Sequence, residues 1–229
     1  GESVEVRQLD LADLDSVRAF AAGVTSPVDA LVNNAGVMAV PLARTAQGFE
    51  MQIGTNHLGH FALTGLLLDR IRDRVVTVSS TAHRMGRIRL DDLNWTRGYS
   101  RWGAYGQSKL ANLLFTSELQ RRLSASGSAV RAFAVHPGYS NTALQGHTDS
   151  GVQNGFMAWA NRVVAQSDTQ GAWPSIFAAT QDLPGNSFIG PDGFAEVKGY
   201  PKLVKRSRRA RDMATAKSLW ELSEDLTGV

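Results

Sequence analysis

The chain has 229 residues, enough for one domain with a sizeable core or two small ones. Hydrophobic residues make up 43% and charged residues 20%, which is ordinary for a soluble globular protein, and no apolar run approaches the roughly 20 residues of a membrane helix. The absence of cysteine excludes disulfides, cysteine metal sites and thiol catalysis. We expect a single cytoplasmic domain over residues 1–229, with neither a visible signal peptide nor a membrane span.

The formal net charge is +3, and the excess is local. KRSRRAR, residues 205–211, is a basic run of the kind that can bind nucleic acid or an acidic membrane surface. No aromatic residues interleave the run, and no nucleic-acid fold motif accompanies it. We therefore favour a solvated loop and helix start, and we expect no nucleic-acid partner.

Strand-like and helix-like segments alternate along the chain. Residues 81–103 are polar and Arg-rich, which predicts a loop with short pieces of structure, and Asp13 is placed to cap the first helix. Residues 139–168 form a long excursion that contains one of the predicted helices. The expected strands are 4–11, 29–36, 74–80, 130–138 and 187–193, and the expected helices are 11–22, 46–70, 104–125, 153–165, 169–180 and 208–226.

This alternation indicates an α/β fold, with a parallel sheet covered by helices on both faces. In such sheets the ligand crevice lies beyond the carboxyl ends of the strands. Polar or turn residues follow four successive predicted strands, which suggests a single site at that end. They are Asp10, Asn33 to Gly36, Ser79 with Ser80, and His136-Pro137-Gly138.

Tyr105 and Lys109 lie four residues apart in AYGQSKLANLLF, so both side chains leave the same face of a helix. A free tyrosine has a pKa near 10, too high for efficient acid–base catalysis at neutral pH. An ammonium at roughly 4–5 Å would favour the phenolate by about two to three pKa units. The pair could then exchange a proton with a carbonyl or alcohol oxygen, although a surface tyrosine stacked on a lysine stem would give the same spacing.

Ser80 could support this chemistry, because a hydroxyl at the carboxyl end of a strand can hydrogen-bond the oxygen that Tyr105 protonates. Ser79 and Ser80 could instead cap the next segment. A serine hydrolase that pairs Ser80 with His83 or His136 is a weaker alternative, since no G-x-S-x-G motif surrounds Ser80.

Asn56 lies on the apolar stripe of the predicted helix 46–70, which should face the sheet. A buried amide needs partners, so Asn56 either bonds a neighbouring loop or holds water or backbone near the crevice. His60 on the same stripe is interpreted as a core histidine, and no residue pattern predicts a metal site. The stripe comprises Phe49, Ile53, Asn56, His60, Leu63 and Leu67.

Together these segments resemble the short-chain dehydrogenase/reductase family, most of all its retinol-dehydrogenase-like branch. The resemblance runs in order over nearly the whole chain and implies a Rossmann-like doubly wound parallel sheet. It also implies an NAD(P)-dependent oxidoreductase that transfers a hydride between nicotinamide and a carbonyl or alcohol, here a lipophilic one. The matching motifs are DLADL (10–14), NNAG (33–36), TNHLGHF (55–61), VTVSS (76–80), YGQSK (105–109) and HPGYSNT (136–142).

The resemblance assigns Tyr105 as the general acid/base, Lys109 as the residue that lowers its pKa and holds the nicotinamide ribose, and Ser80 as the residue that positions the substrate oxygen. Asn56 would anchor a water in the proton relay. NADP is favoured over NAD, and a homo-oligomer (dimer or tetramer) would form through the helices that bear Asn56 and Tyr105. The implied cofactor-binding residues are Asp10, Leu11, Asn33, Ala35, Gly36, Tyr105, Lys109, Pro137, Gly138 and Thr142.

The chain departs from the family in the spacing between Ser80 and Tyr105, which is longer than in most members. The additional residues, 83–102 with Trp95, Tyr99 and Trp102, either form a wall of the substrate pocket or a surface loop unrelated to substrate. Further along the chain, Phe156, Met157 and Trp159 could line a hydrophobic pocket, or belong to the core or a dimer surface.

A second departure is the absence of a T-G-x-x-x-G-x-G motif. In the family's strand order 3-2-1-4-5-6-7, residues 4–11 would be strand 3 and residues 29–36 strand 4, so strands 1 and 2 are apparently missing. Strand 4 would then be a bare edge and strand 3 would lack a neighbour. We expect the sequence to be a fragment. The alternative function is a truncated, non-catalytic scaffold that acts through protein contacts.

Overall fold

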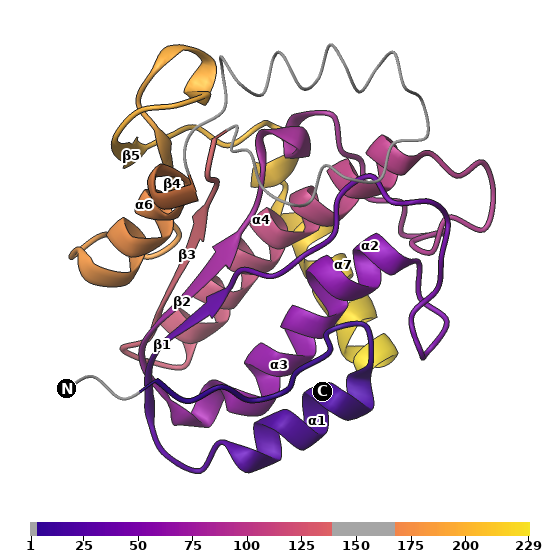
Figure 1. The fold of residues 1–229 in the computed structure, drawn as a ribbon, viewed down its shortest axis with the longest axis horizontal. Coiled ribbons are helices and arrows are strands. Elements are labelled where there is room, and N and C mark those ends of the chain that lie inside the picture. The colour runs from indigo at the N-terminus through magenta and orange to yellow at the C-terminus, as the bar shows by residue number, and fades with distance from the viewer. Residues whose placement is uncertain (1–3, 139–167) are drawn as a thin grey trace.

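Five strands form one sheet in the order β1-β2-β3-β4-β5, and the first four are parallel (Figure 1). The computed structural model describes residues 4–138 and 168–229. β5 runs antiparallel to β4. The strands are β1 (Val28–Asn33), β2 (Ile71–Val78), β3 (Arg131–Val135), β4 (Phe188–Pro191) and β5 (Pro201–Leu203), and the α-helices are α1 (Leu14–Gly23), α2 (Met51–Ile53), α3 (Gly59–Leu67), α4 (Arg101–Ala125), α6 (Asp168–Thr180) and α7 (Met213–Thr227).

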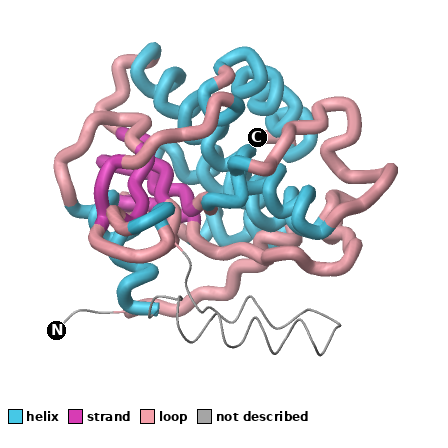
Figure 2. Tube along the Cα trace, turned by 90° about the horizontal axis from the view of Figure 1, so that it is seen from above, coloured by secondary structure: helices cyan, strands magenta, loops and turns pink. Residues whose placement is uncertain are grey.

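Helices lie on both faces of the sheet, as predicted for this α/β fold. α4 packs on β2 and β3, whereas α6 packs on β1, β2 and β3 from the other side. Seen from above, the strands gather at one side of the molecule and most helices beyond them (Figure 2). α7 is an outer layer that covers α4 and α3. In this layered arrangement the second half of β2 and most of β3 are removed from water, which matches the apolar runs there.

The predicted strand at 4–11 is wrong. Residues 4–10 have no secondary structure, and Val4 and Val6 are 87% and 92% exposed. An alternating pattern makes a strand only where a neighbouring strand supplies backbone partners, and within the described residues none lies beside this segment. It is held instead by Arg7, whose guanidinium donates to the carbonyl of Gly23 at 2.7 Å. β1, the predicted strand 29–36, is correspondingly the edge of the described sheet, as expected.

The predicted helix 46–70 begins only at Met51 and is interrupted. The Glu50 carboxylate caps it by accepting from the backbone N–H groups of Gln52 and Ile53, at 3.0 and 2.9 Å. A π-helix, Gly54–Leu58, then separates α2 from α3, and a 3-10 turn follows at Leu68–Arg70. All six stripe residues are buried as predicted, but so are several residues between them, because α7 covers the side of this segment that faces away from the sheet.

The remaining predicted elements agree closely with the structure. Asp13 caps α1 by accepting from the N–H of Asp15, and α4 begins at Arg101 rather than at residue 104. The short strand β5 was not predicted. Further 3-10 turns occur at Thr81–Arg84, Phe194–Glu196 and Arg209–Arg211. The predicted helix at 153–165 lies outside the described residues, as do Thr142, Phe156, Met157 and Trp159.

The basic run 205–211 is a loop that leads into the Arg209–Arg211 turn, as predicted, but it is not wholly solvated and α7 begins only at Met213. Two of its cations hold the fold together. Arg206 donates to the carbonyls of Leu113 and Asn186 at 3.1 and 2.8 Å, and Arg209 donates to that of Gly86 at 3.1 Å. In the described ranges 4–138 and 168–229, no helix has the length and apolar character needed to cross a bilayer.

Candidate active site

Ser80 and Tyr105 meet at the carboxyl end of β2. The strand ends at Val78, and Ser80 follows as the N-cap of the Thr81–Arg84 turn, accepting from the N–H of Ala82 at 3.2 Å. Tyr105 lies in the second turn of α4, close enough to Ser80 for that side chain to lower the pKa of the phenol. Ser80 therefore caps the next segment and lies beside the phenol, so its capping role leaves the predicted contact with a substrate oxygen open.

Ser79 has a different role from Ser80. Its side chain is buried and donates to the backbone carbonyl of Lys109 at 2.7 Å, which fixes α4 against the end of β2. Successive residues of an extended chain point in opposite directions. Ser80, which is only partly buried, is thus the serine available to a substrate.

Lys109 lies beneath Tyr105, with its Nζ 5.8 Å from the centroid of the Tyr105 ring. The ammonium donates to the carbonyl of Val78 at 3.2 Å, and burial lowers its pKa to about 8. Burial raises the pKa of Tyr105 above its usual value, and the Ser80 side chain lowers it in part. The expected lowering of the Tyr105 pKa by Lys109 is therefore wrong for this structure, because the loss of hydration dominates.

Asn56 clamps the loop that follows β1. Its Oδ1 accepts from the N–H of Val37 at 2.8 Å, and its Nδ2 donates to the Val37 carbonyl and to the Ser108 hydroxyl, both at 2.9 Å. The side chain is fully buried and lies in the π-helix Gly54–Leu58, a local irregularity that is common at functional sites. Asn56 thus bonds the neighbouring loop, and it links that loop to α4 one residue before Lys109.

Gly36 passes directly over these side chains. A Cβ there would lie 2.7 Å from Asn56 Oδ1 and 3.6 Å from Lys109 Nζ, so only glycine allows the backbone to approach so closely. The Lys109 ammonium has three donors and one acceptor among the described residues. A buried ammonium with N–H groups still free to donate, next to the closely approaching backbone at Gly36, suits the hydroxyl groups of a nicotinamide ribose. The residues present are therefore compatible with the implied cofactor.

The other predicted cofactor residues are differently placed. Asn33 is buried and donates to the hydroxyls of Thr64 and Thr77, at 2.9 and 3.5 Å, so its amide joins β1 to α3 and β2. Ala35 is exposed in the loop that contains Gly36.

Asp10 and Leu11 lie in the turn before α1. Asp10 is exposed and accepts from the N–H of Ala12 at 2.8 Å, whereas Leu11 is buried against Gly59. Pro137 and Gly138 follow β3, and Gly138 adopts a φ of +77°, which favours glycine.

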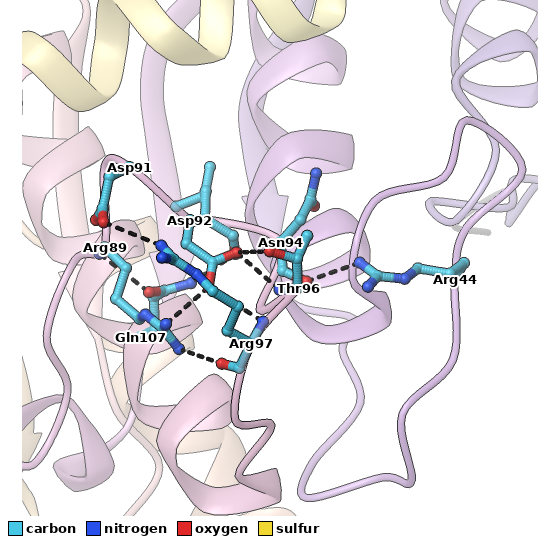
Figure 3. A network of polar contacts seen from close by, with 9 residues as sticks. Arg44, Arg89, Asp91, Asp92, Asn94, Thr96, Arg97 and Gln107 are labelled. Carbon is cyan, nitrogen blue, oxygen red and sulfur yellow. Dashed lines mark hydrogen bonds and ion pairs between the residues drawn. The ribbon is translucent and has the colours of Figure 1, made fainter.

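The inserted segment 83–102 is bonded to the body of the protein, as Figure 3 shows. The buried Asp92 carboxylate accepts from the N–H and hydroxyl of Thr96 at 2.7 and 2.8 Å and from Arg89 at 2.7 Å. Gln107 of α4 donates to the Leu93 carbonyl at 2.9 Å, and the Asn94 amide oxygen accepts from the N–H of Glu50, also at 2.9 Å. This bonding gives the segment a fixed position between α4 and the start of α2.

Trp102 is the aromatic residue of this segment that contacts Tyr105. The two ring centroids are 6.0 Å apart, with an edge-to-face angle of 81°. Trp102 is 44% exposed, although the backbone around it is helical and capped by Ser100. An exposed aromatic ring beside the phenol favours the interpretation of this segment as a wall of the site.

The arrangement of His83 does not support a serine hydrolase. Its Nδ1 lies 2.7 Å from the backbone carbonyl of Ser80, and its Nε2 accepts from the N–H of Ser207 at 3.3 Å. Both ring nitrogens are therefore engaged with backbone groups rather than with the Ser80 hydroxyl. Nor do residues 4–138 and 168–229 contain a cluster of side chains that could hold a metal ion.

Two residues that support the site were not predicted. Ser108 accepts from Asn56 and donates to the Tyr105 carbonyl at 2.9 Å. Asn112 donates to the Val78 carbonyl at 3.0 Å, on the same oxygen as Lys109. Asn112 follows Tyr105 by seven residues, or two helical turns, so its position on the same helix face was readable from the spacing.

Comparison with known proteins agrees with this geometry. The family model for short chain dehydrogenase matches residues 1–153. Human retinol dehydrogenase 11 is 40% identical over 235 residues, covering 100% of this chain and 70% of that protein, and human retinol dehydrogenase 13 is 43% identical over 244 residues, covering 99% and 69%.

Among solved structures, an uncharacterized protein from Mycobacterium Paratuberculosis is 58% identical, with a TM-score of 0.83 over 98% of this chain and 76% of that one. This likeness extends over almost the whole chain, and the matched region of the family model includes the residues around Ser80, Tyr105 and Lys109. The chain therefore belongs to the short chain dehydrogenase family and is an NAD(P)-dependent oxidoreductase.

Proposed function

We propose that this protein transfers a hydride between NADP and a lipophilic carbonyl or alcohol, with Tyr105 as the general acid/base. The observation that carries the proposal is that the buried Tyr105 phenol lies beside Ser80, while the buried Lys109 Nζ lies 5.8 Å from the centroid of the Tyr105 ring. A proton donor, a second hydroxyl and a fixed cation then converge on one substrate oxygen at the end of β2. The cofactor, when bound, supplies or accepts the hydride.

In carbonyl reduction, Ser80 would hold the substrate oxygen by a hydrogen bond, and the Tyr105 hydroxyl would give it a proton. In alcohol oxidation the same proton would return to Tyr105. Lys109, with its pKa of about 8, is mainly cationic at pH 7 and would donate its remaining N–H groups to the hydroxyls of the nicotinamide ribose. Its low exposure strengthens such hydrogen bonds, because little water competes for the ammonium.

The substrate class is supported by two observations. Trp102 exposes its ring beside Tyr105, and such a surface favours an apolar or flat molecule over a small polar one. The relatives at 40% and 43% identity are retinol dehydrogenases, which act on a lipophilic alcohol. The preference for NADP rests on the resemblance to that branch.

Cytoplasmic localisation and oligomerisation remain predictions. The helices named for the oligomer interface, those that bear Asn56 and Tyr105, are covered by α7, whose Trp220 stacks on Phe115 with ring centroids 5.7 Å apart. An oligomer built on this face would have to displace α7. A different surface is therefore the simpler choice for any assembly.

The test is turnover of NADPH and NADH with a series of aldehydes and ketones of increasing chain length, alongside direct measurement of cofactor binding. Tyr105→Phe should keep cofactor binding and reduce turnover by about 10²- to 10⁴-fold. Tyr200→Phe is the matched control, because that ring is 70% exposed and stacks on Trp173, and the change should leave turnover unchanged.

Full turnover in Tyr105→Phe would remove Tyr105 from the mechanism. Failure of the wild-type protein to bind either cofactor would favour the non-catalytic scaffold. Faster turnover of short polar carbonyls than of long apolar ones would refute the substrate class while leaving the role of Tyr105 intact.

A further inference from the structure

His136 is a fully buried histidine at the end of β3, next to Pro137-Gly138. Its Nε2 lies 3.0 Å from Glu196 Oε2, and its Nδ1 accepts from the N–H of Gly138 at 3.2 Å. The ring lies directly against Gly190 of β4, since a Cβ on that residue would be 2.1 Å from Nε2, and only glycine leaves it this space. The imidazole is thus held in one orientation.

The two hydrogen bonds determine where the His136 proton lies. A backbone N–H is only a donor, so Nδ1 must present a lone pair to Gly138. In the neutral ring the proton is then on Nε2, where it is donated to Glu196. Burial lowers the pKa of His136 to about 4, although the Glu196 carboxylate acts in the opposite direction, so the ring is neutral at physiological pH.

The groups that face His136 come from several elements. His83 and Arg84 of the Thr81–Arg84 turn lower its pKa, Glu196 raises it, and the Phe188 ring of β4 lies 5.3 Å from it. Glu196 is the acidic group in this set. Its carboxylate therefore reinforces the Nε2-protonated tautomer that the Gly138 N–H also favours.

Glu196 is itself held on its other oxygen. Arg84 donates to Oε1 at 2.8 Å from the turn that begins immediately after Ser80. One carboxylate therefore connects the segment that carries Ser80 with the segment that carries Pro137 and Gly138. These segments follow different strands, and residues 194–196 lie beyond β4.

The backbone at Glu196 is strained. Ala195 and Glu196 have φ values of +52° and +58°, in the left-handed region that residues with a Cβ rarely adopt. Such a conformation persists only where the surroundings impose it, and it is common at functional sites. Here it aims the Glu196 carboxylate inward, between Arg84 and His136, with its side chain 19% exposed.

We infer that Glu196 is a positioning residue: through His136 it sets the turn at Pro137-Gly138, and through Arg84 it aligns the segment that follows Ser80. The inference rests on the proposed function and on the resemblance that names Pro137 and Gly138 as cofactor-binding residues. Glu196 would touch neither substrate nor cofactor. Its loss should disturb the turn and weaken cofactor binding without altering the chemistry of Tyr105.

The test combines ¹⁵N NMR of the His136 ring with the dissociation constant of NADP. In the wild-type protein we expect one tautomer, protonated at Nε2. Glu196→Ala should give a mixture of tautomers or the Nδ1-protonated form, shift the Gly138 amide signal and weaken NADP binding roughly tenfold or more. The pKa that governs turnover, assigned to Tyr105, should stay where it is in the wild type.

Glu196→Gln is the conservative variant, since its amide oxygen can still accept from His136 Nε2 while the charge toward Arg84 is lost. It should restore the Nε2-protonated tautomer and most of the cofactor affinity. Glu221→Ala is the control, because this exposed glutamate on α7 pairs only loosely with Lys217, at 3.8 Å, and its removal should change neither readout.

An Nδ1-protonated His136 in the wild type would overturn the inference, as would a Glu196→Ala protein with unchanged tautomer, Gly138 signal and NADP affinity. If the wild type binds no cofactor, the proposed function fails by itself, and the tautomer and the Gly138 signal decide whether Glu196 sets the turn. If Glu196→Ala does not fold, Glu196→Met, which removes both carboxylate oxygens but keeps most of the side-chain volume, decides it in the same way.

Discussion

The two flanks of the sheet, β2 with β3 on one side and β1 with residues 4–10 on the other, differ in how deeply their side chains are buried and in how many strand partners they have. Around β2 and β3, side chains such as Val75 and Phe133 are completely buried, and polar groups bond to one another. On the β1 flank, Val32 is 41% exposed and residues 4–10 make no strand contacts. Both flanks contain β-branched and apolar residues, so composition does not explain the difference in burial. The difference follows from the neighbouring strands and helices that each strand has.

This difference in burial indicates which part of the fold can contain side chains with shifted pKa values. A phenol and an ammonium acquire unusual pKa values only where water is excluded, and exclusion requires helices on both faces of the sheet. Lys109 and Tyr105 lie at such a place, between β2 and the helix layer of α4 and α7. The β1 flank, covered less completely, offers no comparable environment.

The largest expected effect is a difference in the loss of unfolding free energy when an apolar side chain is truncated on each of the two flanks. Phe133→Ala should reduce the free energy of unfolding by about 3–5 kcal/mol, because it leaves a cavity in a region with no exposed surface. Val32→Ala on β1 should cost less than about 1 kcal/mol, since that side chain is already partly in water. Urea unfolding measures both, and equal losses would contradict the contrast between the flanks.

A second effect, on the order of 3 kcal/mol, concerns Lys109. Its pKa of about 8 in the folded protein lies below the ordinary 10.5, so the folded state loses this proton first as the pH rises. Lys109 therefore opposes folding below about pH 8, and this cost disappears as the pH rises from about 8 to above 10.5. Lys109→Met should be the more stable protein at pH 7, and its advantage should shrink over that range.

The measurement is the free energy of unfolding of both proteins between pH 7 and 11. Taking the difference between them removes the contribution of Tyr105, whose raised pKa favours folding below pH 10 and is lost above it. Lys217→Met, at an exposed ion pair on α7, should show no such pH dependence. A constant difference between wild type and Lys109→Met would show that the ammonium is not penalised by burial.

A third effect concerns the clamp between Asn56 and the loop after β1. Asn56→Ala removes three hydrogen bonds and leaves the backbone groups of Val37 without their side-chain partners, at a cost of about 2 kcal/mol. The Val37 amide should exchange with solvent much faster, while amides in β3 should keep their protection. Asn34→Ala, at an exposed position of the same loop, is the control. Unchanged exchange at Val37 would refute the clamp.

The sequence predicted most of this architecture because its signals are local. The Asp13 cap, the buried stripe with Asn56 and the strand ends at Ser80 and His136 all follow from spacing and residue type. The strand at 4–11 failed for a physical reason: alternation creates a preference, whereas a ladder needs a partner that the described chain does not provide there.

The sequence predicted that Ser80, Tyr105, Lys109 and Asn56 lie close together, but it did not predict their electrostatics. The spacing of Tyr105 and Lys109 shows that they share a face, but it contains no information on burial, which reverses the expected direction of the Tyr105 pKa shift. The contact between Glu196 and His136 could not be predicted from the sequence, because the two residues are 60 positions apart and no periodic pattern relates them. The three-residue strand β5 is similarly set by pairing with β4 rather than by a run of its own.

The smallest expected effect on stability comes from a substitution on β1, the edge strand of the described sheet. β1 pairs with β2 on one side, and on its other side no strand lies beside it among the described residues. Edge strands with exposed apolar residues can pair with other chains, and a lysine in such a strand discourages this. Val32→Lys should change the free energy of unfolding by less than about 0.5 kcal/mol and reduce self-association.

Light scattering at increasing protein concentration measures that self-association. Asp29→Lys, also exposed on β1 but already charged in the wild type, is the matched variant and should have a smaller effect. If Val32→Lys associates as strongly as the wild type, the β1 edge is not the surface through which chains meet. Association would then have to be sought on the helix side, where α7 covers α3 and α4.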